Sequence, residues 1–344
     1  MDTDTEPQSF WSEWRDAVEP RTVALIVGVL LLQMGFIASY VGAFHTPTPH
    51  RVPLAVVAPA PVTSGTVERL NGLRGHPLRA SAVASRAEAA ARVRAGSTAG
   101  AFVIDAQSRT DALLVSSGAG VAEAEALRAV ITEVDASQQR TVTVTDLVPV
   151  QPGDGRGLTG FYLVIGWIVG GYLVASLLGV SRGSRPANPR RAAFRLMAVV
   201  PYAIVSGFGG ALVVDQILGA LTGHFVALWW LGALLVAASA TVTTAFQVLF
   251  GVLGIGITVL VFVIIGNPTA GGAYQPDLLP TFWRVLAYTL PNGAGTDAVR
   301  RIVYFGSNGI GGHLAVIAAY AVGGAAVAMA ASVRHHRRHQ LLDI

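Results

Sequence analysis

The chain has 344 residues, of which 52% are hydrophobic and only 13% are charged, and its mean hydropathy is +0.55. Soluble domains carry about 25% charged residues, so this composition excludes a disordered chain and an ordinary cytosolic enzyme. The absence of Cys excludes a disulfide framework and Cys-ligated metal. All 24 basic residues are Arg, so the chain has no Lys for a Schiff base or for the phosphate-binding loop of an ATPase.

The first segment, residues 1–21, is predicted to form a cytoplasmic amphipathic helix. Trp11 and Trp14 recur there at helical spacing, and Trp favours the membrane interface. This helix either anchors the chain to the membrane or contacts a cytoplasmic partner, and the sequence leaves both readings open.

Charge divides the rest of the chain into two parts. Residues 45–156 carry 21 charged residues in 112, as a soluble domain does, whereas residues 157–333 carry only 11 in 177. About 20 apolar residues cross a membrane. The uncharged runs therefore predict a helical membrane protein with six spans, one before the 45–156 domain and five after it: 22–44, 159–180, 195–218, 225–243, 248–266 and 312–333.

Residues 45–156 are predicted to form a small α/β domain. The expected helix over 121–137 is the clearest, because its apolar residues recur on one face and acidic residues lie in its first turn. The other expected elements are strands at 53–57, 78–83, 100–104, 112–115 and 140–148, and helices at 67–73 and 86–94.

The uncharged run of residues 216–276 is long enough for two spans, and we divide it at a polar cluster near its middle. These polar side chains are expected to form a tight turn. The alternative is that they hold membrane helices together across a dimer. The cluster consists of Thr241, Thr243, Thr244 and Gln247.

Arg in short loops sets the expected orientation, because such loops stay in the cytoplasm. The 181–194 loop has no acidic residue and the 334–344 tail is also basic, so both are expected inside, with the N-terminus inside and the 45–156 domain outside a bacterial plasma membrane. The loop is also a candidate contact for a cytoplasmic partner through Arg182, Arg185, Arg190 and Arg191.

Residues 267–305, between the last two spans, are rich in Gly, Pro and aromatic residues. Two short helices are expected, at 279–288 and 294–304, the second capped by Gly295 or Thr296 and with Asp297 in its first turn. Irregular backbone at membrane depth is tolerated where protein or a water-filled cavity surrounds it. We therefore interpret this segment as re-entrant from the outer leaflet, shaping an exit.

Ionisable residues in a membrane body are functional candidates. Asp215 is either an interfacial carboxylate or a proton or cation site, with an ion pair to Arg284, Arg300 or Arg301 as a further option. Asn267 either lines a pathway or caps a turn. Arg300 and Arg301 either contact anionic headgroups or substrate, or they lie at the end of a solvated helix. The candidate pathway or gate residues are Asp215, Asn267, Pro268, Trp283, Arg284, Asn292, Asp297, Arg300 and Arg301.

Catalysis receives little support. Neither G-x-S-x-G nor H-E-x-x-H occurs, and no His, Asp and Glu cluster has metal-ligand spacing, so no catalytic residue, metal or cofactor is expected. The basic pI of about 9.7 comes from Arg that flank membrane segments, so membrane lipids rather than nucleic acid are the expected partners.

Two parts of the chain resemble one family, the exit of the first span and the 266–272 stretch taken together with 290–301. The exit of the first span (39–45 with 53–57), the glycine-rich 266–272 stretch and the 290–301 stretch are similar to the YhgE/Pip-like, DUF3533-type membrane proteins of the ABC-2 transporter permease class. The resemblance implies a homodimer that exports an amphipathic or lipid-like substrate with the help of a separate cytoplasmic ATPase. Two alternatives stay open: a proton-coupled exporter, and a non-transporting scaffold whose outer domain binds a partner.

Overall fold

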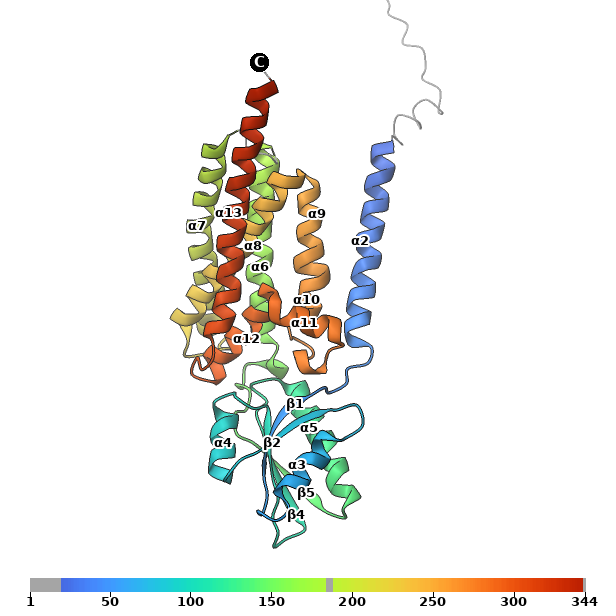
Figure 1. The fold of residues 1–344 in the computed structure, drawn as a ribbon. Helices are drawn as coiled ribbons and strands as arrows, with labels where there is room; N and C mark the ends of the chain where they lie inside the picture. Colours follow the sequence, from blue (N-terminus) through green and yellow to red (C-terminus); the bar gives the residue numbers. More distant parts are fainter. Residues whose placement is uncertain (1–19, 184–187, 343–344) are drawn as a thin grey trace, which may run out of the picture.

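The computed structural model describes residues 20–183 and 188–342 and is mostly helical, with one small mixed sheet (Figure 1). Trp11 and Trp14, on which the expected N-terminal helix rests, lie outside the described residues, as does Arg185. In the described part, five helices are long and apolar enough to cross a membrane, which indicates a membrane-embedded protein. They are α2 (Pro20–Phe44), α6 (Thr159–Arg182), α7 (Pro189–Ala211) with its π-helical continuation η2 (Leu212–Ile217), α8 (Phe225–Phe250) and α13 (Gly311–Leu342).

Residues 45–157, which we call the sheet unit, contain a five-stranded sheet in the order β2-β1-β3-β4-β5. Only β3 and β4 pair antiparallel. Helices α3 and α5 cover one face and α4 covers the other (Figure 1), so the expected α/β arrangement is confirmed. The elements are β1 (Val52–Val57), α3 (Thr63–Asn71), β2 (Leu78–Ala82), α4 (Arg86–Arg94), β3 (Gly100–Val103), β4 (Thr110–Val115), α5 (Val121–Ser137), β5 (Thr141–Asp146) and the 3-10 turn η1 (Gly155–Gly157).

Side-chain size explains how the two faces of the sheet differ. Leu54 and Phe102 point toward α3 and α5 and form a large apolar core there. Ala55 and Ala101 point the other way, where the alanine-rich α4 packs on them. Because both faces are buried, β1 reads as a nearly continuous apolar run rather than an alternating one.

Helix α8 is the centre of the membrane bundle and is packed by α6, α7 and α13 (Figure 1). Glycines on the outer helices allow the backbones to approach closely. A Cβ at Gly207 of α7 would lie 2.5 Å from the Trp229 carbonyl oxygen of α8, and one at Gly324 of α13 would lie 2.6 Å from the Val242 nitrogen. Small residues at these crossings therefore set the spacing of the bundle.

The turn expected at the polar cluster is wrong, because α8 continues through it to Phe250. Thr243 and Thr244 donate hydrogen bonds to the carbonyl oxygens of Ser239 and Ala240, one turn back in the same helix (2.7 and 2.8 Å). Hydroxyls satisfied in this way do not end a helix. The chain reverses instead at Gly251, whose φ of +64° is the left-handed conformation that glycine adopts at a helix end.

The next apolar run is broken and shorter than the other membrane helices. It consists of α9 (Leu253–Val259), the π-helical η3 (Leu260–Ile265) and α10 (Gly266–Thr269), which together span 17 residues. The fifth expected span, 248–266, overlaps this run. The chain continues through η4 (Pro276–Leu278), α11 (Thr281–Thr289) and α12 (Pro291–Tyr304) before α13 begins.

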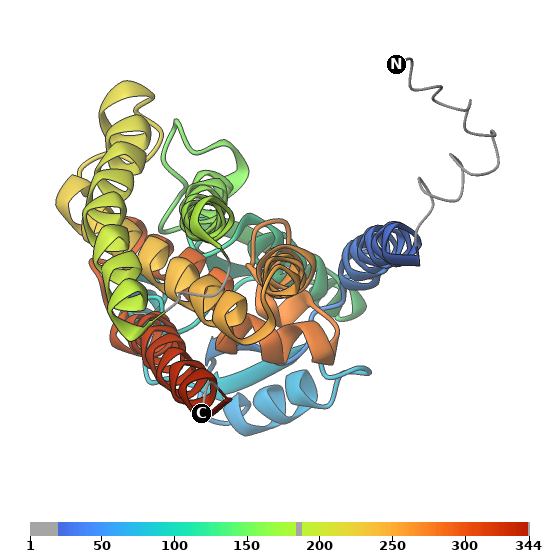
Figure 2. The same cartoon turned by 90° about the horizontal axis from the view of Figure 1, so that it is seen from above.

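Helix α2 stands to one side of the bundle in both views (Figures 1 and 2). Only 6% of its most apolar stretch is buried, against 61% for α8. It meets the rest of the protein near its C-terminal end, where the Ser39 hydroxyl donates to the Ile264 carbonyl and the rings of Phe44 and Tyr274 lie 5.7 Å apart. Most of its apolar surface therefore has no protein partner in the described chain.

Candidate functional site

The segment 267–305 lies between the membrane bundle and the sheet unit (Figure 1). Its two expected helices are present as α11 and α12, but α12 begins earlier than expected, at Pro291. Proline is favoured in the first helical turn because its fixed φ suits the helix and it has no N–H to satisfy. Thr296 is therefore inside the helix, where its hydroxyl donates to the Asn292 carbonyl (3.1 Å), so neither it nor Gly295 is the cap and Asp297 is not in the first turn.

Asn292 connects α12 to the broken helix. Its side chain is fully buried, and its Nδ2 donates to the Phe262 carbonyl oxygen (3.0 Å) and to Asn267 Oδ1 (3.1 Å). Phe262 belongs to the π-helical η3, a turn type that is frequent at functional sites. Two sequence-predicted residues 25 positions apart are thus brought together, and the neighbouring Pro268 is buried beside Asn267 in α10.

Arg300 points into the protein rather than ending a solvated helix or reaching headgroups. The residue is 5% exposed, and its Nη2 donates to the Gly271 carbonyl oxygen (2.6 Å). Gly271 has a φ of +73°, which presents that carbonyl to the guanidinium at little cost for glycine. This contact fixes the start of the 271–280 connection against α12.

Arg301, one residue on, belongs to a charged cluster with Asp297 and His313. Asp297 Oδ2 lies 3.1 Å from His313 Nε2 and 3.4 Å from Arg301 Nε, and Arg301 Nη1 donates to the Asn308 carbonyl oxygen (2.8 Å). His313 comes from the first turn of α13, so this cluster joins α12 to the next membrane helix.

Trp283 and Arg284 lie on α11. The Trp283 ring faces the end of α2, since a Cβ at Gly42 would lie 3.7 Å from it. Arg284 Nη2 donates to the Leu279 carbonyl oxygen (3.3 Å), which fixes the turn before its own helix. The segment is expected to lie outside the membrane, where the positive-inside rule disfavours Arg. Its three Arg residues, Arg284, Arg300 and Arg301, are each held by contacts within the protein.

Asp215 lies away from this segment, in η2 between α7 and α8. Its Oδ1 accepts from Gln216 Nε2 (2.8 Å) and its Oδ2 accepts from the His224 backbone nitrogen (3.3 Å). The optional ion pair with Arg284, Arg300 or Arg301 is not formed among the described residues. The carboxylate instead stabilises the connection that leads into α8.

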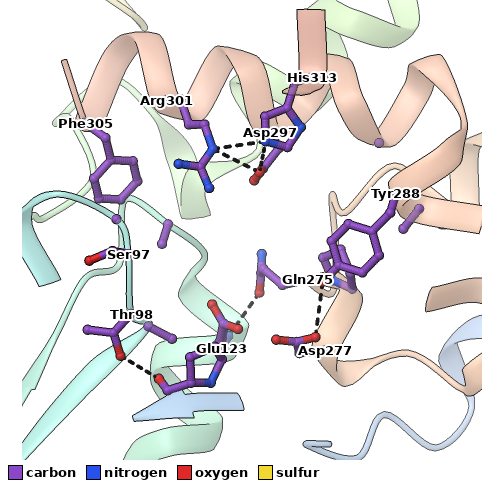
Figure 3. Close-up of a pocket in the computed structure, with 17 residues that line it drawn as sticks. Ser97, Thr98, Glu123, Gln275, Asp277, Tyr288, Asp297, Arg301, Phe305 and His313 are labelled. Carbon is purple, nitrogen blue, oxygen red and sulfur yellow. Dashed lines mark hydrogen bonds and ion pairs between the residues drawn. The ribbon is translucent and has the colours of Figure 1, made fainter. Parts of the chain in front are cut away.

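A cavity of about 240 Å³ lies where the sheet unit meets α11, α12 and α13 (Figure 3). We call it the interface cavity. Asp297 and Arg301 were expected from sequence to be functional, whereas the other polar side chains on its walls were missed: Ser97, Thr98, Glu123, Gln275, Asp277, Tyr288 and His313. These come from six elements or connections, so no local pattern in the sequence marks them.

Glu123 is the acidic residue that the sheet unit contributes to this cavity, from the first turn of α5. Its backbone nitrogen donates to Gln275 Oε1 (3.0 Å), and its carboxylate lies toward the opposite wall (Figure 3). Burial, with a further contribution from the nearby Asp277 carboxylate, raises the pKa of Glu123 to about 8. Asp277 accepts a hydrogen bond from the Tyr288 hydroxyl (3.2 Å).

Glycines let the sheet unit dock closely on the cavity region. A Cβ at Gly118 would lie 2.8 Å from the Tyr304 ring, and a Cβ at Gly120 would overlap the Gln275 side chain. The Tyr304 hydroxyl also donates to Asp154 Oδ2 (2.6 Å), a carboxylate whose Oδ1 accepts from the first nitrogen of α6. Side chains of the 267–305 segment thus fill spaces that only glycine leaves open.

The predicted partner-contact residues lie elsewhere. Arg190 and Arg191 are exposed in the first turn of α7, at the end of the bundle far from the sheet unit, and Arg182 is the last residue of α6. We compared the chain with profiles of protein families, with curated proteins and with solved structures, and none of the three comparisons finds a match.

Proposed function

We propose that this chain is the permease subunit of an ABC-2-type exporter, similar to YhgE/Pip and DUF3533 proteins, that moves an amphipathic or lipid-like substrate outward. The supporting observation is the broken helix α9–η3–α10, which is followed by the buried Asn267–Asn292 contact. Discontinuous membrane helices with buried polar groups are typical of substrate pathways in transporters. Here the break lies beside the end of α2.

A lipid-like substrate is favoured by the surroundings of α2. The apolar surface of α2 is almost entirely unburied, and α2 stands to one side of the bundle. A molecule dissolved in the bilayer can therefore approach the broken helix α9–η3–α10 from the side. A substrate from water would need a polar route through the bundle. The centre around α8 is mainly apolar, and the buried hydroxyls of Thr243 and Thr244 are bonded within their own helix.

The proposed topology has six spans, with the 17-residue run 253–269 as the fifth and the sheet unit outside. Arg190, Arg191, Arg334 and Arg337 lie at the end of the bundle opposite the sheet unit, which supports cytoplasmic placement of that end. A homodimer in contact with membrane lipids is part of the proposal, because an isolated α2 leaves apolar surface that a second copy or lipid must cover.

The proposed energy source is a separate ATPase that docks on the exposed start of α7. Proton coupling through Asp215 is less well supported, because both oxygens of that carboxylate already hold the α7–α8 connection. The scaffold alternative, in which the sheet unit only binds a partner, predicts no substrate movement and is decided by the transport measurement below.

Outward transport can be measured in inside-out vesicles from the source cells. A fluorescent short-chain phosphatidylethanolamine is added to the exposed cytoplasmic leaflet, and its ATP-dependent protection from dithionite reports transfer to the lumen. We expect protection with the wild type and about tenfold slower transfer with Asn267→Ala plus Asn292→Ala. Equal protection in vesicles that lack the protein would overturn the proposal.

Recovery of the ATPase provides a second test. The tagged protein is purified from native membranes, and copurifying proteins with a nucleotide-binding motif are quantified by mass spectrometry. We expect Arg190→Gln plus Arg191→Gln to reduce their recovery. The matched control changes two exposed Arg of the sheet unit, Arg86→Gln plus Arg94→Gln, and should leave recovery unchanged.

A further inference from the structure

The charges around the interface cavity are not balanced evenly. On one wall, Asp297 has two basic neighbours, Arg301 and His313, within 3.4 Å. On the other side, Glu123 and Asp277 have no salt bridge to any described residue, although both line the same cavity. Two carboxylates in one confined space oppose each other's ionisation, and the cations close to them, Arg300 for Glu123 and Arg284 for Asp277, donate hydrogen bonds to backbone carbonyl oxygens instead.

The walls of the cavity combine these carboxylates with aromatic rings. Tyr288 from α11 and Phe305, which follows α12, line it together with the Gln275 amide (Figure 3). Aromatic faces attract organic cations, and a carboxylate with an aromatic ring is a common arrangement for binding an ammonium group. Nearby Arg300 does not neutralise Glu123 directly, because its Nη2 is bound to the Gly271 carbonyl.

The volume of the cavity fits a small group. About 240 Å³ corresponds to roughly eight water molecules at about 30 Å³ each, or to a molecule with about as many heavy atoms. That is enough for an ethanolamine or phosphoethanolamine group and too small for a whole lipid.

We propose that the interface cavity is a binding site for an organic ammonium group, with Glu123 and Asp277 as the residues that recognise the positive charge. The ammonium group comes either from a free small amine or from the headgroup of an aminophospholipid. A bound cation supplies the direct ion pair that these carboxylates lack, and Tyr288 and Phe305 cover its apolar side. The site lies between the sheet unit and the membrane helices, so occupancy stabilises their docking. This proposal stands whether or not the chain is an exporter.

The raised pKa of Glu123 supports this assignment. The charged groups that face Glu123 across the cavity or lie close to it are Asp277, Asp297, Arg300, Arg301 and His313. Since burial and Asp277 hold the proton on Glu123, an incoming ammonium group favours its release. We therefore expect binding at neutral pH to release protons, which calorimetry in buffers of different ionisation enthalpy detects.

The test uses the full chain in nanodiscs of phosphatidylglycerol, titrated with ethanolamine and, as the neutral control, ethylene glycol. We expect a saturable rise of the unfolding temperature with ethanolamine alone. Its dissociation constant should rise about tenfold in Glu123→Gln and in Asp277→Asn, and should not change in the control Glu125→Gln. Glu125 lies two residues along the same helix, is exposed and does not line the cavity.

The source of the ammonium group is decided by adding phosphatidylethanolamine to the nanodiscs. If the headgroup is the ligand, the lipid raises the wild-type unfolding temperature and removes the response to free ethanolamine; if a free amine is the ligand, the response persists. Gel filtration verifies folding, and the two variants lie on different elements, so failure of one to fold leaves the other. The proposal is overturned if ethanolamine gives no saturable effect, or if the effect is the same in all three variants.

Discussion

Buried polar side chains in this protein have two different consequences, which depend on whether a partner is present. The Nδ2 group of the fully buried Asn292 donates two hydrogen bonds and so joins two helices, whereas its Oδ1 has no hydrogen-bond partner in the described chain. Asp135 of α5 is 1% exposed, and neither of its carboxylate oxygens has a hydrogen-bond partner in the described chain. A satisfied buried group contributes to the fold, whereas an unsatisfied one costs free energy.

Replacing Asn292 by Ala should lower the free energy of unfolding by about 1–3 kcal/mol, because the Phe262 carbonyl and Asn267 Oδ1 lose their donor in an apolar environment. Thermal unfolding of the purified chain measures this change. Asn308→Ala, at an exposed position, is the control and should change it by less than about 0.5 kcal/mol. Additive effects of Asn292→Ala and Asn267→Ala would contradict a direct contact.

Asp135 predicts a pH dependence of stability. Burial, followed by the nearby Asp111 carboxylate, raises the pKa of Asp135 from 3.8 to about 6. The folded chain therefore holds this proton more tightly than the unfolded chain, and that contribution to stability is complete below about pH 4 and is lost as the pH rises through about 6. Asp135→Asn should stabilise the sheet unit by about 1–2 kcal/mol at pH 7 and give little change at pH 4.

Local unfolding of the sheet unit can be followed by the labelling rate of a single introduced cysteine, since the chain has no cysteine of its own. Ala101→Cys places a thiol in the core between β3 and α4, where the residue is fully buried. Its labelling rate should fall with Asp135→Asn at pH 7. The same fall with Glu133→Gln, an exposed neighbour on α5, would show that a general charge effect is responsible.

At the scale of elements, glycine decides how closely the parts pack. Within the bundle, Gly207 and Gly324 admit the backbone of α8, and at the interface Gly118 and Gly120 admit side chains of the 267–305 segment. The same residue type thus serves helix packing in one place and docking of the sheet unit in the other. A methyl group at either place must displace its neighbour.

Gly120→Ala should loosen the docking, because the new methyl group displaces Gln275 and removes the hydrogen bond from the Glu123 nitrogen. A reporter cysteine at Ala119, which lines the interface cavity, should be labelled about tenfold faster in this variant. Gln275→Ala in the same chain should partly restore slow labelling by making space. Gly65→Ala, where no atom lies within 4 Å of the added methyl, should leave the rate unchanged.

At the scale of the whole molecule, the distribution of Arg divides the ends of the bundle. Arg190 and Arg191 are exposed at the end far from the sheet unit, whereas Arg284, Arg300 and Arg301 at the near end are held by carbonyl oxygens or by Asp297. By the positive-inside rule the first set favours cytoplasmic placement of the far end, whereas the second set opposes placement of the near end outside. The contacts of the second set give these three Arg partners within the protein.

Two single cysteines test that orientation. Ser108→Cys on the sheet unit and Ser181→Cys near the end of α6 are both exposed. A membrane-impermeant maleimide applied to intact cells should label the first and not the second, and permeabilised cells should show both. Labelling of Ser181→Cys alone in intact cells would reverse the proposed topology.

The sequence by itself determined the elements whose signals are local. Periodicity and the first-turn acids predicted α5 with its observed bounds, and uncharged length predicted the five long apolar helices. The turn at Thr243 and Thr244 was predicted wrongly, since their hydroxyls bond within the helix and leave no need for a break. Composition alone does not distinguish a polar cluster in a turn from one whose hydroxyls bond within a helix.

Only the tertiary structure decided which distant residues meet. Glu123 and Gln275 are 152 positions apart, and Tyr304 and Asp154 are 150 apart, so no spacing rule links them. Their contacts exist because three-dimensional packing brings the sheet unit against α11–α13, where glycines leave room. Local sequence determines which segments are helical, apolar or charged, but burial and charge balance at a site are properties of all the elements that surround it. For that reason the interface cavity could be found only in the folded chain.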